Sequence, residues 1–168
     1  PSKGCGAFGD AGCIVTDNEE LAKLFRIFRN YGSEKRYHNM MVGSNSRLDE
    51  LQAGLLRVKL AHLEEFNEER CRIAARYNEE IINPLVQKPL IRPGADSTWH
   101  QYVIHVPGHC DELMDYLKEH EIGTLIHYPI PPHLSEAYAY LGHKRGDYPI
   151  AEQYADEVLS LPMYNGMT

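Results

Sequence analysis

Cysteine, long apolar runs and basic charge are scarce in this sequence, and each scarcity excludes a class of protein. Only four cysteines occur in 168 residues, without CxxC spacing or a metal-ligand grouping, so we expect reduced thiols in a cytoplasmic protein. No apolar run approaches the about 20 residues that cross a bilayer, and we expect no signal peptide. Lysine and arginine number 17 against 24 acidic residues, a formal net charge of −7. This balance disfavours nucleic acid as a partner, because phosphate contacts need a basic face.

The rest of the composition is that of an ordinary globular chain. Hydrophobic residues make up 43% and charged residues 24%. A chain of this length can bury a core in one or two domains. The sequence opens at Pro1 without an initiator methionine, and we expect it to be the C-terminal part of a longer protein.

A glycine-rich segment opens the chain and holds one lysine, Lys3. Glycines permit positive φ angles and the close approach of a ligand, so the lysine can reach whatever the loop holds. Lys3 could be a solvated loop residue, pair with a phosphate, or form a Schiff base with an aldehyde. The segment then predicts a tight turn and a buried strand over 12–16.

Apolar spacing predicts two helical regions in the first half. The first covers 17–30, with Asp17 as N-cap. The second is one long helix over 45–82, capped by Ser46 and broken, if at all, near 66–69. The predicted buried stripe of the first helix consists of Leu21, Leu24, Phe25 and Phe28. The charged run of the second, from Glu64 to Arg72, is expected to be a solvated face.

The second half has a mixed pattern of short strands and helices. Prolines and a glycine make 83–97 the most linker-like stretch, and we predict a boundary near 84 between domains 1–83 and 84–168. The predicted strands are 101–106, 123–127 and 160–163. The predicted helices are 110–120, 137–142 and one that begins at 147–149, with its inner face formed by Ala151, Tyr154, Ala155 and Val158.

Two stretches carry candidate binding residues. Asn45 lies at the start of the predicted long helix, where free N–H groups and the dipole favour an anion, or it merely caps that helix. Arg47 could assist in binding or pair with Asp49 or Glu50. The polar loop over 33–44 could touch a phosphate or be a solvated connection.

The other stretch, over 127–133, is stiffened by prolines and presents His127, Tyr128 and His133. These side chains could hydrogen-bond a sugar or a pyrophosphate, or belong to a rigid packed turn. A metal site is not expected, because no acidic or cysteine third ligand has useful spacing.

Five segments together resemble the DegT/StrS-type sugar aminotransferase family. They are PSKGCGAFGDAG at 1–12, GSNSRLDELQA at 43–53, WHQYV at 99–103, IHYP at 126–129 and LSLPMY at 159–164. Members of this family transfer an amino group from glutamate or glutamine to a nucleotide-linked keto sugar with pyridoxal 5′-phosphate. The resemblance implies an α/β, aspartate-aminotransferase-like fold (fold type I). Residues 1–83 would be the end of the large domain with a long connecting helix, and 84–168 the small C-terminal α+β domain.

The resemblance also implies roles for single residues. Lys3 would be catalytic and hold the cofactor covalently, and Asn45 would reach across a homodimer to the cofactor phosphate of the other subunit. His127, Tyr128, His133 and Arg47 would bind the nucleotide sugar. The family usually has Asn-Leu after the lysine, where this chain has Gly4 and Cys5, which puts the local loop contacts in question.

Three functions therefore stand as hypotheses. The first is an aminotransferase of surface polysaccharide or antibiotic sugar biosynthesis; IHYPIPPHL and LSLPMY look closest to members that aminate C3 of a dTDP-3-keto-6-deoxyhexose. The second is a related pyridoxal-phosphate sugar dehydratase, which Lys3 disfavours because those enzymes usually have histidine there. The third is a catalytically incomplete fragment that acts as a dimerisation or sugar-nucleotide-binding module.

Overall fold

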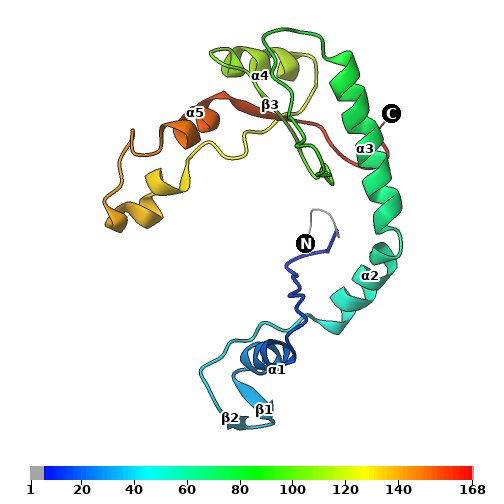
Figure 1. Ribbon diagram of the computed structural model, residues 1–168, viewed down its shortest axis with the longest axis vertical. Coiled ribbons are helices and arrows are strands. Elements are labelled where there is room, and N and C mark those ends of the chain that lie inside the picture. Colours follow the sequence, from blue (N-terminus) through cyan, green and yellow to red (C-terminus); the bar gives the residue numbers. More distant parts are fainter. Residues whose placement is uncertain (1–5, 168) are drawn as a thin grey trace. The chain divides into compact units, whose positions relative to one another are not determined.

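The computed structural model describes residues 6–167 (Figure 1). Its elements are α1 (Glu19–Phe28), β1 (Ser33–Lys35), β2 (His38–Asn39), α2 (Glu50–Leu60), α3 (Leu63–Glu80), β3 (Tyr102–His105), α4 (Cys110–Glu119), the 3-10 helices η1 (Pro132–Leu134) and η2 (Glu136–Leu141), α5 (Pro149–Glu157) and β4 (Val158–Leu161). No helix in this part of the chain has the length and apolar character needed to cross a membrane.

The chain divides into two compact units, and the boundary along the sequence lies between Glu64 and Glu65. The first unit carries α1, the β1–β2 hairpin and α2, and the second carries β3, β4, α4 and α5. The predicted boundary near 84 concerns the domains of the complete fold, and it stays a prediction.

Helix α1 begins one residue later than its predicted cap implies. The side chain of Asn18, rather than that of Asp17, accepts a hydrogen bond from the Leu21 N–H, at 3.1 Å. This bond satisfies one of the N–H groups that the first helical turn leaves without a partner. The polar loop predicted after the helix contains the short antiparallel hairpin β1–β2.

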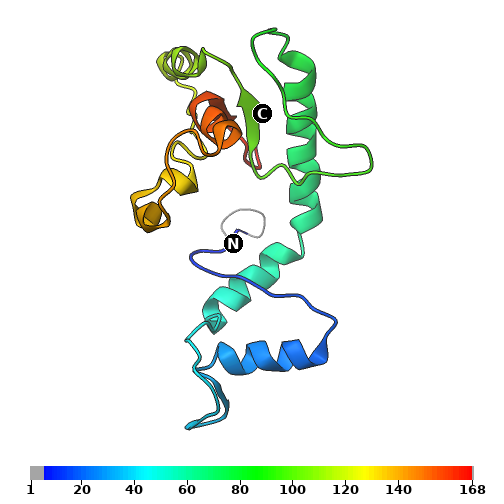
Figure 2. The same cartoon turned by 60° about the vertical axis from the view of Figure 1, so that its left-hand side comes forward.

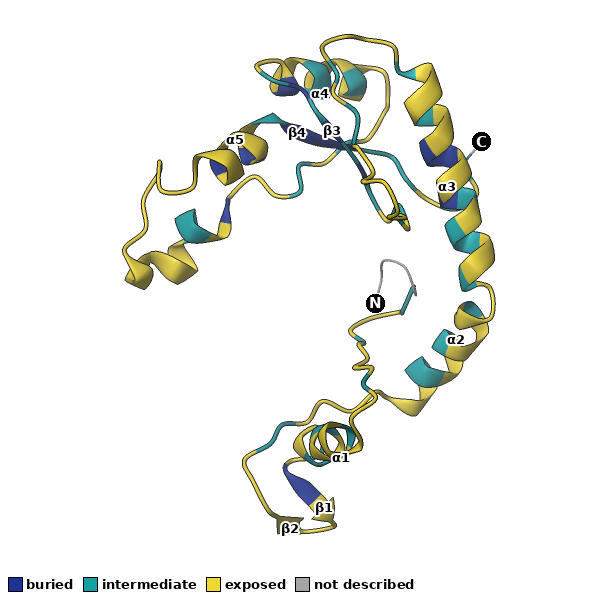
Figure 3. Cartoon of the chain, in the orientation of Figure 1, coloured by how far each residue is buried: buried dark blue, intermediate teal, exposed yellow. Residues whose placement is uncertain are grey.

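Two apolar features predicted to be buried in the first unit are exposed. Residues 12–16 form no strand, and Ile14 and Val15 are 67% and 88% exposed. A strand needs a hydrogen-bonded neighbour, and no described strand pairs with this segment. The α1 stripe is open as well, since neither α1 nor α2 has a buried residue (Figure 3).

The single long helix predicted over 45–82 is two helices. Helix α2 begins at Glu50 with Asp49 as N-cap, while Ser46 instead pairs with the Ser44 hydroxyl at 2.8 Å. The break lies at 61–62, not near 66–69. There the His62 N–H bonds to the Lys59 carbonyl, a tightened turn that ends the α-helical ladder.

The second unit is built on the antiparallel pair β3–β4 (Figure 2). In its register Tyr102 pairs with Leu161 and His105 pairs with Val158. Both strands were predicted, although β4 begins two residues early. The predicted strand over 123–127 is reduced to one bridge between Leu125 and Ser160. The helices α4 and α5 confirm two of the three predicted helices, and the one predicted over 137–142 is the 3-10 helix η2. The core cluster consists of Ala74, Tyr102, Ile104, Val106, Cys110 and Leu159.

Helix α3 holds the end of the chain through a buried arginine. Arg70 is 6% exposed and donates to Thr98 O, Asn67 Oδ1 and Asn165 Oδ1, at 3.1, 2.6 and 2.7 Å. Asn165 in turn donates to Glu69 Oε2 at 2.8 Å. The prediction of a solvated charged face is therefore wrong for Arg70, because its side chain is satisfied inside the unit.

Candidate functional site

The predicted binding residues fall in both units. Lys3 lies outside the described residues, so its role stays a prediction. Asn45 and Arg47 lie in the first unit, in the segment that leads into α2. His127 and Tyr128 lie in the second unit between α4 and η1, and His133 lies within η1.

Arg47 and Asn45 form a connected polar group. Arg47 Nε donates to Asn45 Oδ1 and Nη1 donates to Asn30 Oδ1, both at 3.2 Å. The guanidinium also lies 5.4 Å from the centre of the Tyr31 ring. The described partners of Arg47 are therefore two amide side chains and one aromatic ring. The alternative prediction, an ion pair with Asp49 or Glu50, is wrong for this structure.

The side chains of Asn45 and Arg47 keep hydrogen-bond donors that an anion could use. The Asn45 oxygen is used by Arg47, and the amide nitrogen has no hydrogen bond to another described residue. An amide N–H and a guanidinium are groups that bind phosphate oxygens. The N-cap of α2 is Asp49, so Asn45 precedes the helix and its predicted place at the helix N-terminus is wrong. Any phosphate here would be bound by side chains rather than by the helix end.

His127 is held by Ser160 of β4. His127 Nδ1 lies 2.8 Å from Ser160 Oγ, and the backbone of Ser160 exchanges two hydrogen bonds with Leu125, at 2.8 and 3.3 Å. Ser160 is only 6% exposed. Tyr128 packs edge-on against the His127 ring, at 5.3 Å between centroids, and is 65% exposed. One buried serine thus fixes the histidine while the neighbouring phenol faces solvent.

His133 is held by Glu152 of α5. His133 Nε2 lies 2.9 Å from Glu152 Oε1, with side-chain exposures of 9% and 6%. Both Glu152 oxygens also accept from the Gly146 N–H, at 2.8 and 2.9 Å, and Oε1 accepts from the Tyr148 N–H at 3.3 Å. Burial alone would raise the pKa of Glu152, but the hydrogen bonds from His133, Gly146 and Tyr148 together outweigh it and lower the pKa.

Two rings from the loop before α5, those of Tyr148 and His143, lie near the His133 ring. The Tyr148 ring lies 4.8 Å from the His133 ring and 5.4 Å from that of His143. His143 Nδ1 is 3.4 Å from Asp147 Oδ2. The loop that joins η2 to α5 therefore folds back over the histidine of η1.

The sequence did not reveal Glu152, Tyr148 or Ser160 as members of this site. Glu152 occupies the first turn of α5, where an acidic residue is ordinarily a solvated partner of the helix dipole. The predicted inner face of this helix is also partly wrong: Ala155 is buried, but Tyr154 is 49% exposed and the buried residue of the first turn is Glu152. No periodic pattern in the sequence indicates that Gly146 and Tyr148, in the loop before α5, donate hydrogen bonds to the Glu152 carboxylate.

The structure does not bring all predicted residues of the second unit into one contact group. Among residues 6–167, no hydrogen bond or ring contact joins His127 to His133. What relates them is the α5–β4 segment, which supplies a buried polar partner to each. The same part of the chain contains no group of three or more histidine, cysteine, aspartate or glutamate side chains placed to hold a metal ion.

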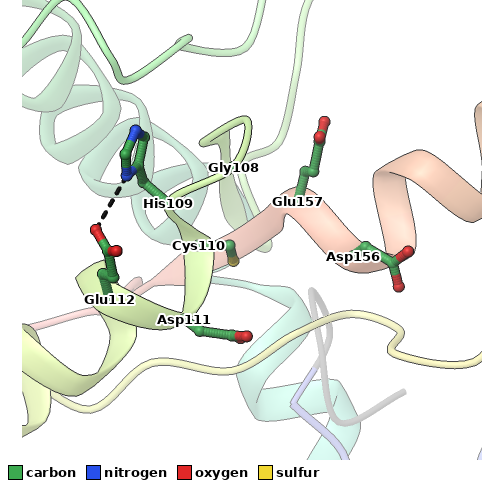
Figure 4. Close-up of a pocket in the computed structure, with 7 residues that line it drawn as sticks. All are labelled: Gly108, His109, Cys110, Asp111, Glu112, Asp156 and Glu157. Carbon is green, nitrogen blue, oxygen red and sulfur yellow. Dashed lines mark hydrogen bonds and ion pairs between the residues drawn. The ribbon is translucent and has the colours of Figure 1, made fainter.

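A pocket of about 350 Å³ lies elsewhere in the second unit, at the start of α4 and the end of α5 (Figure 4). Its lining includes four carboxylates, those of Asp111, Glu112, Asp156 and Glu157. In Figure 4 the His109 ring turns toward Glu112, where Nδ1 and Oε2 are 3.0 Å apart. None of the predicted site residues lines this pocket, and its negative charge opposes a phosphorylated ligand.

The model of the DegT/DnrJ/EryC1/StrS aminotransferase family matches residues 1–168. The chain belongs to this family. The resemblance seen in the five sequence segments is therefore confirmed.

Curated relatives match along nearly the whole chain. The erythromycin biosynthesis sensory transduction protein EryC1 of Saccharopolyspora erythraea is 47% identical over 164 residues, which are 97% of this chain and 44% of the relative. The dTDP-3-amino-3,4,6-trideoxy-alpha-D-glucose transaminase of Streptomyces venezuelae is 44% identical over 164 residues, 97% of this chain and 43% of the relative. The chain thus spans less than half the length of these relatives.

The fold agrees with a solved structure of the family. The crystal structure of S. venezuelae DesV in complex with a ketimine intermediate matches with a TM-score of 0.95 and 42% identity, over 99% of this chain and 45% of that chain. The predicted fold class, part of an aspartate-aminotransferase-like α/β fold, is confirmed.

Proposed function

We propose that the protein containing this chain is a pyridoxal-phosphate-dependent aminotransferase. It transfers an amino group from glutamate or glutamine to a nucleotide-linked keto-deoxysugar. The observation that carries this proposal is the 44% identity with a dTDP-amino-sugar transaminase, within a family of aminotransferases that matches the chain from end to end.

The residues of this chain fit such a cofactor. Lys3 would hold it covalently through its amine. Asn45, whose amide nitrogen is open, and Arg47 would hold its phosphate. When bound, pyridoxal phosphate supplies the electron sink that no amino-acid side chain provides. The free Lys3 amine would accept and return the proton of the donor α-carbon.

The second unit would bind the nucleotide sugar. His127, Tyr128 and His133 carry its hydrogen-bonding groups. The exposure of Tyr128 and the buried partners of the two histidines support this assignment, because a fixed side chain loses little entropy when it binds. We place the amination at C3 of a dTDP-3-keto-6-deoxyhexose, in agreement with the 3-amino sugar in the name of the S. venezuelae relative.

We further propose a cytoplasmic homodimer, with Asn45 of one subunit serving the cofactor of the other. Free thiols at Cys13, Cys71 and Cys110 are consistent with a reducing compartment. The dimer itself can be tested directly by sedimentation of the full-length protein.

The central experiment is reductive trapping in the full-length protein. After incubation with pyridoxal phosphate and borohydride, peptide mapping should find a pyridoxyl group on Lys3. Lys3→Arg keeps the charge and should abolish steady-state transamination. Lys23→Arg, at an exposed lysine paired with Glu34 at 2.9 Å, is the matched control and should retain full activity. Steady transamination by Lys3→Arg would reject the assignment.

Two other functions remain as outcomes of that experiment. A dehydratase would carry the cofactor but give a deoxygenated sugar instead of an amino sugar, which product analysis by mass distinguishes. A binding or dimerisation module would give no adduct at Lys3 while still binding the nucleotide sugar.

A further inference from the structure

His133 presents one ring nitrogen to the protein and the other to solvent. Nε2 is bonded to Glu152. Nδ1 has no hydrogen bond to another described residue, yet no fully buried side-chain nitrogen or oxygen in the described residues lacks a partner. Nδ1 is therefore accessible, although the side chain as a whole is only 9% exposed.

We propose that Glu152 is a positioning residue that keeps the hydrogen of His133 on Nε2, so that Nδ1 is the atom that meets an oxygen of the bound nucleotide sugar. This inference rests on the proposed function, which it deepens by naming the atom and the residue that orients it.

The chemistry of Glu152 gives the direction of the hydrogen bond. An ionised carboxylate only accepts hydrogen bonds, so the nitrogen that faces it must be the donor. The backbone N–H groups of Gly146 and Tyr148 also donate to Glu152 Oε1, the oxygen that meets His133, so the carboxylate is held by three donors. Because Nε2 donates to Glu152, the hydrogen cannot move to Nδ1 unless the buried hydrogen bond to Glu152 breaks. Nδ1 then accepts from a sugar hydroxyl when the ring is neutral, or donates to a phosphate oxygen when the ring is charged.

The surrounding loop makes the orientation rigid. Tyr148 lies against the His133 ring and is tied to Glu152 by its own N–H. Three segments thus meet at one carboxylate: η1 with His133, the loop with Gly146 and Tyr148, and the first turn of α5. A carboxylate that only stabilised its own helix would not need partners on the two other segments.

A direct test is the ¹⁵N spectrum of the full-length protein labelled in histidine, with the His133 signals identified by their loss in a His133→Gln variant. We expect Nε2 to be protonated in the free protein. The Nδ1 shift tells a neutral from a charged ring, and hence a hydroxyl from a phosphate partner; either form agrees with the proposal. A neutral ring with its hydrogen on Nδ1, or a rapid mixture of the two neutral forms, would overturn it.

Two substitutions separate the two nitrogens. The amide nitrogen of glutamine lies near the place of Nε2, and that of asparagine near the place of Nδ1. His133→Gln should keep the bond to Glu152 and the melting temperature, but raise KM for the nucleotide sugar about three- to tenfold, the effect of one hydrogen bond. KM for the amino donor should not change. His133→Asn should lower the melting temperature. A folded His133→Gln enzyme with the wild-type KM would refute the role of Nδ1.

A second histidine–glutamate pair in the same unit supplies the control. Glu157 lies 2.6 Å from His105, with exposures of 21% and 15%, and neither belongs to the proposed site. Glu152→Ala should allow the hydrogen of His133 to occupy either ring nitrogen and should raise KM for the nucleotide sugar. Glu157→Ala should change neither the His133 tautomer nor this KM. If the wild type shows no transamination and no adduct at Lys3, the proposed function fails. If it is active while the spectrum or His133→Gln disagrees, only the positioning role fails.

Discussion

Ser160 and His127 are joined by a hydrogen bond of 2.8 Å between Oγ and Nδ1, and this bond links strand β4 to the predicted sugar-binding stretch. The serine is buried, and its backbone also holds Leu125. Because Ser160 is buried and its hydroxyl bonds to the His127 ring, Ser160 fixes the orientation of His127.

Ser160→Ala should therefore raise KM for the nucleotide sugar several-fold and lower the free energy of unfolding by about 1 kcal/mol, the usual effect of one lost hydrogen bond. Ser33→Ala is the matched control, since Ser33 is 8% exposed and bonds to Asn39 Oδ1 at 2.9 Å in the other unit. It should cost similar stability and leave KM unchanged. Equal KM effects from both variants would argue against a specific support of His127.

Asn45 should contribute to cofactor affinity through its free amide nitrogen. Asn45→Ala removes a donor to a charged phosphate, and we expect about a tenfold weaker affinity for pyridoxal phosphate. Asn45→Asp keeps the shape but places a negative charge beside the phosphate, so its affinity should be weaker still. Absorbance titration of the full-length protein measures both. An aspartate variant that binds as well as the wild type would remove Asn45 from the phosphate site.

The sequence was informative where local patterns decide the structure. The apolar spacing of Leu113, Met114 and Leu117 predicted α4, whose observed bounds are Cys110–Glu119, and the apolar alternation of 101–106 predicted β3. The five motif segments predicted the family and with it the fold. None of these inferences needed knowledge of distant contacts.

Long-range contacts account for what the sequence could not show. Glu152 receives its partners from positions 4, 6 and 19 residues away, and no periodicity marks such a set. Likewise, the spacing of Leu21 and Leu24 identifies an apolar face on α1 but not what covers it. Both residues are more than 40% exposed in a chain that spans less than half the length of its relatives.

The hydrogen bond between Asn165 and Glu69 should make the free energy of unfolding depend on pH. The hydrogen bond from Asn165, followed by that from the Gly166 N–H, lowers the pKa of Glu69 below its ordinary value of 4.5. A carboxyl group with a lowered pKa in the folded state stabilises the fold above its unfolded pKa, and this contribution is lost as pH falls through the folded pKa. Melting temperatures should therefore decline below about pH 4.5, and less steeply in Asn165→Ala.

Asn67→Ala is the control for that experiment. Asn67 also accepts a hydrogen bond from Arg70, at 2.6 Å, but within residues 6–167 it has no hydrogen bond to Glu69. It should lower stability at every pH and keep the wild-type slope. Parallel pH profiles for Asn165→Ala and the wild type would contradict the role of Asn165.

Among the described glycines of the first unit, Gly32 should be the one whose substitution lowers stability most. Its φ is +71°, and an added Cβ would lie 1.8 Å from the Met41 carbonyl oxygen. Gly32→Ala should destabilise the protein by more than the about 1–3 kcal/mol that such a backbone conformation alone costs. Gly54, inside α2, has nothing within 4 Å of the added Cβ, so Gly54→Ala should instead stabilise by about 0.5–1 kcal/mol. Denaturant unfolding of both variants measures this difference in sign. A Gly32→Ala protein as stable as the wild type would mean that the turn after α1 can reach another conformation without loss.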